Sequence, residues 1–126
     1  MLRAHVLACL ALLSACTDPP DARLTAASRE DPACKTELVA ALEALRDALG
    51  LGFEVQASDA DTLAERGDLA KRYTRDAVAY TSEFGLDLAD DVCAVQLWSM
   101  TEQRPGSTVT HTGDFGAVPL ELCRCE

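Results

Sequence analysis

The 126-residue chain has few basic residues, few aromatic residues and little histidine, and these shortages exclude several classes of function. Lys and Arg number 11 against 21 Asp and Glu, which gives a formal net charge of −10. Nucleic acids and anionic lipid surfaces are bound through clustered basic side chains, so neither is an expected partner. With only two histidines, the chain offers little material for acid–base catalysis.

Motifs that carry catalysis are also missing. Ser107, His111 and Asp114 are close in sequence, but no Gly-x-Ser-x-Gly stretch frames the serine. Residues 113–116, Gly-Asp-Phe-Gly, follow no strand-to-helix junction, so they are interpreted as a turn and not as a phosphate-binding loop. We therefore expect a protein that is not an enzyme and has no cofactor. A small hydrolase that uses Ser107 and His111 is the alternative.

The apolar run at residues 6–13 is too short to span a bilayer. Arg3 precedes it, and small residues and then Thr17-Asp18-Pro19-Pro20 follow it, which is the layout of a secretory signal peptide. The four residues Leu13-Ser14-Ala15-Cys16 resemble the lipobox of bacterial lipoproteins. The resemblance covers the first sixteen residues only.

The lipobox resemblance implies that residues 1–15 are a signal peptide and that Cys16 carries the lipid. Several acyl chains on one residue give stable membrane anchoring. Because Thr17 and not Asp follows the cysteine, the resemblance favours an outer-membrane lipoprotein that faces the periplasm or the cell surface. Residues 17–31 are rich in Pro, Ala, Asp and Ser, and we expect residues 16–31 to form the lipidated cysteine and a disordered tether.

Six cysteines remain to be assigned. Cys9 leaves with the signal peptide and Cys16 takes the lipid. Four are left in an oxidising compartment, in a body too small to depend on its core alone, and this favours two disulfides. The expectation is that Cys34 and Cys93 are bonded to Cys123 and Cys125, in an order that the sequence leaves open. A zinc site is the alternative, but the spacing lacks the C-x₂₋₄-C pairs that such sites use.

The predicted globular domain spans residues 32–126. Asp31 and Pro32 are an N-cap and a first helical residue, and Gly50 ends a helix whose apolar stripe is Leu38, Leu42, Leu45 and Leu49, with Cys34 on the same stripe. A second helix is predicted from Thr62, with a capping box at Thr62 and Glu65, to about Phe84. Its buried stripe is Leu69, Tyr73, Ala77, Tyr80 and Phe84. The last third is strand-like. The predicted fold is therefore α+β: two amphipathic helices packed on a small antiparallel hairpin or three-stranded meander, stapled by disulfides.

Trp98, Met100 and His111 are the candidate contact residues. A hairpin turn at residues 102–107 would pair Trp98 with His111, whereas a loop of Pro105 and Gly106 alone would pair Met100 with His111. The longer loop is favoured, since Pro-Gly forms a type II turn that splays strands. Either register predicts that all three side chains share one sheet face.

A tryptophan, a methionine and a histidine are similar in residue type to the site of small periplasmic copper carriers, although those are methionine-richer β-barrels. Two candidate ligands are too few for a specific site, so no metal is expected. The sequence predicts a lipid-anchored protein of the bacterial cell envelope. It would act as a non-catalytic binding module, with the membrane and an envelope protein as partners. A periplasmic copper-handling protein is one alternative, and an envelope hydrolase is the other.

Overall fold

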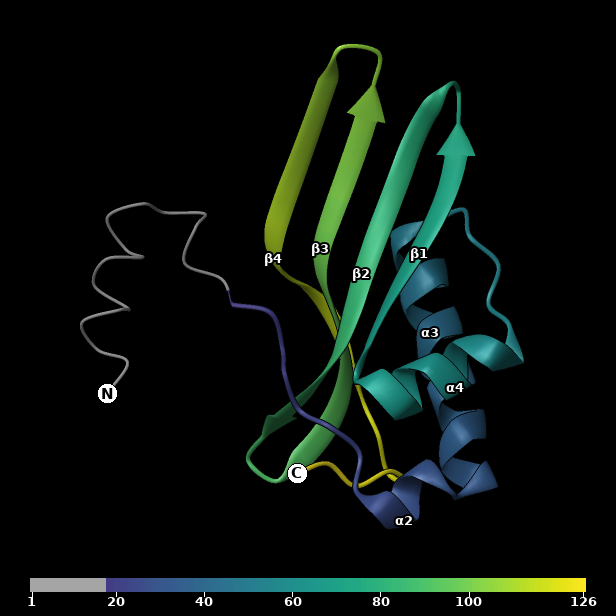
Figure 1. Ribbon diagram of the computed structural model, residues 1–126, viewed down its shortest axis with the longest axis vertical. Helices are drawn as coiled ribbons and strands as arrows, with labels where there is room; N and C mark the ends of the chain where they lie inside the picture. Colours follow the sequence, from purple (N-terminus) through teal and green to yellow (C-terminus); the bar gives the residue numbers. More distant parts are fainter. Residues whose placement is uncertain (1–17) are drawn as a thin grey trace, which may run out of the picture.

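The computed structural model describes residues 18–126, which form three helices and one four-stranded antiparallel sheet. The helices are α2 (Ala26–Arg29), α3 (Pro32–Leu49) and α4 (Ala57–Arg66). The strands are β1 (Asp68–Arg75), β2 (Val78–Ala89), β3 (Val92–Arg104) and β4 (Ser107–Pro119), and they lie in the order β1-β2-β3-β4. Figure 1 shows α3 and α4 packed beside the sheet, with the ends of both long hairpins extending beyond them. The predicted α+β class and the antiparallel meander are confirmed, with one more strand than expected.

Helix α3 begins and ends where the sequence predicts. The side chain of Asp31 accepts a hydrogen bond from the backbone N–H of Ala33 at 2.9 Å, and Pro32 is the first helical residue. Gly50 ends the helix in the left-handed conformation, at φ 66°. The predicted stripe from Cys34 through Leu38, Leu42 and Leu45 is buried. Leu49, in the last turn, is the exception at 40% exposed.

The predicted second helix is wrong for most of its length. Helix α4 begins earlier, at Ala57, and its capping box joins Gln56 and Asp59, not Thr62 and Glu65. The chain leaves α4 at Gly67, which adopts φ 80°, and then forms β1 and β2. Gly67 packs against Ala22 and Arg23, and a Cβ atom added to Gly67 would lie 2.9 Å from the backbone oxygen of Ala22. A left-handed residue without room for a side chain stops the helix at this point.

Two-residue turns connect all four strands. Asp76 and Ala77 join β1 to β2 with φ of 53° and 65°. Asp90 and Asp91 join β2 to β3 with φ of 51° and 63°, so these adjacent acids belong to a turn. Positive φ at both central residues is the geometry that matches the twist of a hairpin.

The turn between β3 and β4 is the two-residue loop, which the sequence disfavours. Arg104 pairs with Ser107, so Pro105 and Gly106 alone form the loop, and Met100 pairs with His111. Gly106, at φ 79°, supplies the one left-handed residue that a Pro-Gly turn needs. The predicted turn at residues 113–116 lies inside β4.

The segment predicted to be a disordered tether is largely part of the folded body. Ala22 bridges to Leu86 at the edge of β2, and Leu24 bridges to Cys125 near the C-terminus. Leu24 is fully buried, and α2 follows it immediately. Figure 1 shows this segment and the C-terminal tail meeting beside α2. The domain boundary at residue 32 is therefore too late, because the N-terminal segment completes the core and pairs with the tail.

The core lies between the helices and one face of the sheet. Its fully buried members include Leu38 and Leu42 of α3, Leu63 of α4, Phe84 and Leu86 of β2, and Val95 and Leu97 of β3. Among residues 18–126, no helix has the length and apolar character to cross a bilayer. Residues 1–17, which include Cys16 and the predicted signal peptide, lie outside the described part of the chain.

Candidate functional site

Trp98 occupies a break in the regular pairing of β3. Leu97 pairs with Phe84 on one side and Gly116 on the other, whereas Ser99 pairs with Glu83 and Thr112. The chain therefore carries one extra residue at Trp98 relative to β2, which is a β-bulge. The alternation of side chains shifts by one residue at that point.

The bulge separates the three residues expected to share a face. Met100 packs against the hydrophobic core, and its cross-strand partner is His111. Trp98 instead lines a groove on the other face of the sheet, together with Ala70 and Glu83. The prediction of one common face was wrong because it assumed strict period-two alternation from Trp98 to Met100. Nothing in the residue types around Trp98 indicates the extra residue.

The groove beside Trp98 has a volume of 820 Å³. The N-terminal segment forms one wall with Pro19 and Pro20, and the end of α4 and the start of β1 form the other. Pro20 lies over Gly85 of β2, where an added Cβ would come within 2.5 Å of its ring. Gly85 therefore allows the N-terminal segment to lie flat on the outer face and to close that side of the groove.

The groove combines apolar surface with charges of both signs. Half-buried Trp98 and Pro20 supply the apolar surface, while Arg66 and Asp68 form an ion pair at 3.2 Å on the opposite wall. Glu83 adds a carboxylate beside Trp98. Protein contact sites are often built from a tryptophan next to hydrogen-bonding groups, because the side chain offers both a large apolar area and a polar N–H.

The alternative copper site is not assembled. Met100 and His111 lie opposite each other on β3 and β4, but Trp98 is on the other face of the sheet. Within residues 18–126, no group of three or more His, Cys, Asp or Glu side chains could hold a metal ion. The arrangement offers one thioether and one imidazole, which falls short of a specific copper site.

The residues of the hydrolase alternative are also kept apart. Ser107 and His111 both belong to β4, and four residues of extended chain separate their Cα atoms by about 13 Å. A nucleophile and its base must lie within hydrogen-bond reach. Asp114 accepts a hydrogen bond from the backbone N–H of Gly116 at 3.2 Å, within the irregular part of β4 between Thr112 and Gly116. The three residues do not form a catalytic unit.

The four remaining cysteines form two disulfides, and the structure fixes the order that the sequence left open. Cys34 is bonded to Cys123 and Cys93 to Cys125, with Cα separations of 5.0 and 5.3 Å. Both distances lie in the normal range for disulfides. Because β4 is one long strand ending at Pro119, opposite Ala94, the tail passes directly beside Cys93. With all four thiols used in this way, the zinc alternative is wrong.

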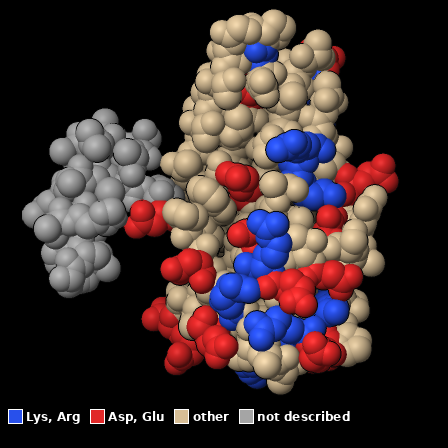
Figure 2. All heavy atoms as spheres, in the orientation of Figure 1, with Lys and Arg blue, Asp and Glu red and all other residues tan. Residues whose placement is uncertain are grey.

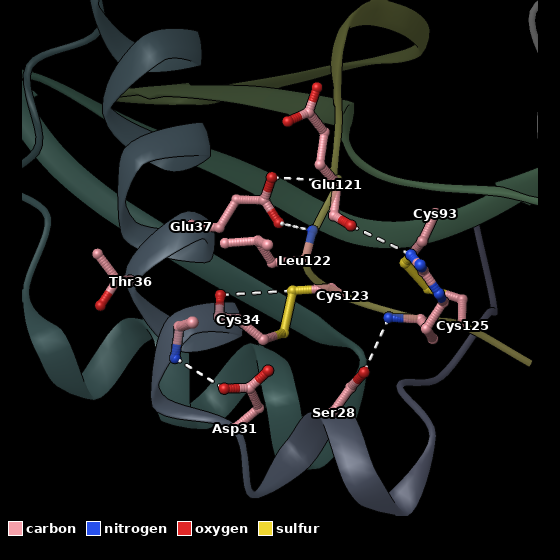
Figure 3. The surroundings of a disulfide bond; sticks show 12 residues. Ser28, Asp31, Cys34, Thr36, Glu37, Cys93, Glu121, Leu122, Cys123 and Cys125 are labelled. Carbon is pink, nitrogen blue, oxygen red and sulfur yellow. Dashed lines mark hydrogen bonds between the residues drawn. A yellow bond between two sulfur atoms is a disulfide. The ribbon is translucent and has the colours of Figure 1, made fainter.

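Glu37 holds the tail next to the first disulfide (Figure 3). Its two carboxylate oxygens accept hydrogen bonds from the backbone N–H groups of Glu121 and Leu122, at 2.7 and 2.8 Å. Ser28 of α2 accepts a further bond from the N–H of Arg124 at 2.8 Å. The disulfides and these bonds lock the tail against α2, α3 and β3. Leu24 of the N-terminal segment pairs with Cys125 of this tail. The groove wall that the N-terminal segment forms is therefore held in place by the disulfide-bonded tail.

No protein family, curated protein or solved structure matches the chain.

Proposed function

We propose that the protein is a lipid-anchored binding module of the bacterial cell envelope, which contacts a partner protein through the groove beside Trp98. The observation that carries the proposal is the position of Trp98, the chain's one tryptophan, half-buried in a bulge at the wall of an 820 Å³ groove. A bulge that turns a large aromatic residue out of the core, into a groove, is typical of a binding site.

The proposed partner is a polypeptide segment. The groove has an apolar side chain, Trp98, for packing, and it has Arg66, Asp68 and Glu83 for polar contacts of both signs. Nucleic acid would require an excess of basic groups, which a chain of net charge −10 does not supply. A lipid tail would require a uniformly apolar lining. A peptide carrying an apolar side chain flanked by polar groups matches the mixture.

The lipid on Cys16 gives the module its location. Pro19 and Pro20 line the groove, so a chain anchored at Cys16 holds the groove within a few residues of the membrane surface. One residue extends at most about 3.5 Å, so the segment from Cys16 to Pro19 reaches on the order of 10 Å. This is much shorter than the expected tether, because Pro20 already packs on Gly85 and Ala22 already pairs with Leu86. The proposed partner is therefore a segment exposed close to the same membrane.

Site-specific photo-crosslinking in cells tests the groove. The photoreactive residue is placed at Ala70, which is exposed and lines the groove, and at Thr108 on β4 as a control outside it. The expected result is a discrete protein adduct from position 70 that disappears in the Trp98→Ala background and is retained with Trp98→Phe. Equal adducts from both positions, or adducts that persist without Trp98, would contradict the proposal. Urea unfolding of Trp98→Ala checks that the fold is intact.

A further inference from the structure

Glu83 is a half-buried carboxylate of the groove that lacks an ion-pair partner. It lies on β2, and its neighbours across the sheet are Ala70 of β1 and Ser99 of β3, neither of which is charged. Within residues 18–126 the side chain of Glu83 makes no ion pair and no hydrogen bond. Half-burial removes part of the water around a carboxylate, so an opposite charge beside it is attracted more strongly than on an open surface.

The basic side chains that line the groove are already engaged. Arg66 forms its ion pair with Asp68, and the guanidinium of Arg23 donates a hydrogen bond to the backbone oxygen of Glu65. Arg72 lies on the same face of the sheet as Glu83 and diagonally across from it, which is a separation of about 7–8 Å between Cα atoms. It does not line the groove, and the two side chains form no ion pair. The charge that the groove leaves unpaired is therefore negative.

The indole ring of Trp98 lies beside this carboxylate. Trp98 directly precedes Ser99, which pairs with Glu83, and both Trp98 and Glu83 line the groove. The face of an indole ring attracts a cation more strongly than the face of any other aromatic side chain. A half-buried indole and an unpaired carboxylate, side by side in one groove, therefore form a site for an organic cation.

We propose that the groove binds an arginine side chain of the partner polypeptide, with the guanidinium stacked on Trp98 and its N–H groups donating to Glu83. This inference rests on the proposed function, and it specifies which side chain of the partner enters the groove. A guanidinium is planar, so it stacks on a ring while its edge donates two parallel hydrogen bonds to one carboxylate. The ammonium of lysine is a strongly hydrated point charge and does not combine the two contacts. The aliphatic stem of arginine matches the apolar wall at Pro20.

The charge of the whole chain also favours a basic occupant. A formal net charge of −10 attracts a basic segment over long range and repels an acidic one. Figure 2 shows acidic and basic side chains interleaved over the lower part of the visible face, where the N-terminal segment and α4 lie in Figure 1. Interleaved charges offset one another, whereas Glu83, which has no ion-pair partner, keeps its attraction for an external cation. The net charge thus draws the basic segment toward the protein, and Glu83 fixes where the cation binds.

Fluorescence titration of the full chain in non-ionic detergent tests the arginine site, because Trp98 is the chain's one tryptophan. The probe is acetyl-Gly-Ala-Arg-Ala-Gly-amide, and the matched peptides carry lysine or citrulline in place of arginine. Citrulline has nearly the shape of arginine but no charge. The arginine peptide should protect Trp98 from acrylamide quenching, with a Kd at least about five-fold lower than that of the citrulline peptide. Equal Kd values for these two peptides, or protection by none of the three, would overturn the inference.

Two variants separate the role of Glu83 from a general effect of charge. Glu83→Gln is compared with Asp87→Asn, which removes the same charge from a half-buried residue of the same strand and face, but outside the groove. Glu83→Gln should abolish the preference for arginine over citrulline, and Asp87→Asn should retain it. An equal loss of preference in both variants would overturn the inference, because net charge alone would then explain the binding. Urea unfolding of both variants checks that the fold is intact.

Photo-crosslinking from position 70 distinguishes a failure of this inference from a failure of the proposed function. The expected adduct is lost with Glu83→Gln and retained with Asp87→Asn, and the cross-linked segment of the partner contains an arginine. An adduct that depends on Trp98 but is undiminished by Glu83→Gln would overturn the arginine assignment and leave the proposed function standing. The absence of any adduct that depends on Trp98 would contradict the proposed function, whereas the peptide titration would still decide whether the groove selects arginine.

Discussion

The two disulfides close loops of different length around the same tail, and their removal should cost nearly the same free energy. Cys34 and Cys123 are separated by 89 residues, and Cys93 and Cys125 by 32. In the chain-entropy description, closing such loops destabilises the unfolded state by about 4.6 and about 3.7 kcal/mol, respectively. When the Cys93–Cys125 bridge is already present, it shortens the path from Cys34 to Cys123, and the larger value falls to about 4.3 kcal/mol.

The variants for this test are Cys34→Ala with Cys123→Ala, and Cys93→Ala with Cys125→Ala. Alanine is chosen because three of these residues are at most 3% exposed, and a serine hydroxyl there would lack a partner. Urea unfolding of these variants in a Cys16→Ser background, monitored by circular dichroism, gives the free energy of unfolding. Both variants should lose about 4 kcal/mol, within about 1 kcal/mol of each other. A loss below about 1 kcal/mol for either pair would refute the reasoning, because the tail would then be held by packing alone.

Three further changes test other parts of the structure. Glu37→Ala should lower the free energy of unfolding by about 1 kcal/mol by leaving two backbone N–H groups of the tail without their acceptor, and Glu37→Gln should cost less; equal stability of all three proteins in urea would contradict this. Ala77→Gly should raise the free energy of unfolding by about 0.5 kcal/mol, because glycine removes the strain of Ala77 at φ 65°; a lower urea midpoint would disprove it. Cys16→Ser should move the protein from the membrane to the soluble fraction, and unchanged fractionation would argue against the anchor.

The sequence predicted α3 because its start and end signals are local, and it predicted which four cysteines form disulfides because only those four remained. Asp31 and Pro32 begin α3, and Gly50 ends it, each through its own backbone preference. The four disulfide cysteines were predicted from an expected oxidising compartment and from their even number. The order of pairing did not, because it depends on where β4 ends, and the turn predicted inside β4 placed the tail elsewhere.

The second helix was mistaken for a physical reason. Leu69, Tyr73, Tyr80 and Phe84 are pairs of residues spaced by four, which fits one face of a helix and equally one face of a strand. In the hairpin, Leu69 pairs with Phe84 and Tyr73 with Tyr80, so all four still lie on one face. Leu69 and Phe84 are buried and Tyr73 and Tyr80 are half-buried, so the spacing fits the hairpin as well as a helix, and only Gly67 and the turn at Ala77 distinguish the two.

The groove was not predictable from the sequence. It depends on the bulge at Trp98 and on the N-terminal segment lying over Gly85, and neither has a local signal. The composition of residues 17–31 indicated a tether, because only Leu24 marks the segment as part of the core. Leu24 is fully buried and pairs with Cys125, which lies at the other end of the chain. The composition of a segment does not reveal contacts with distant parts of the sequence.

The proposed function requires that the chain is exported and anchored through Cys16, and that its two disulfides form in the cell. Non-reducing peptide mapping by mass spectrometry, on protein taken from bacterial membranes, tests these features in one measurement. The predicted result is an N-terminal peptide that begins with a lipid-modified Cys16, together with linked peptides that join Cys34 to Cys123 and Cys93 to Cys125. An unmodified chain that begins at Met1, or free thiols at the four positions, would contradict the account.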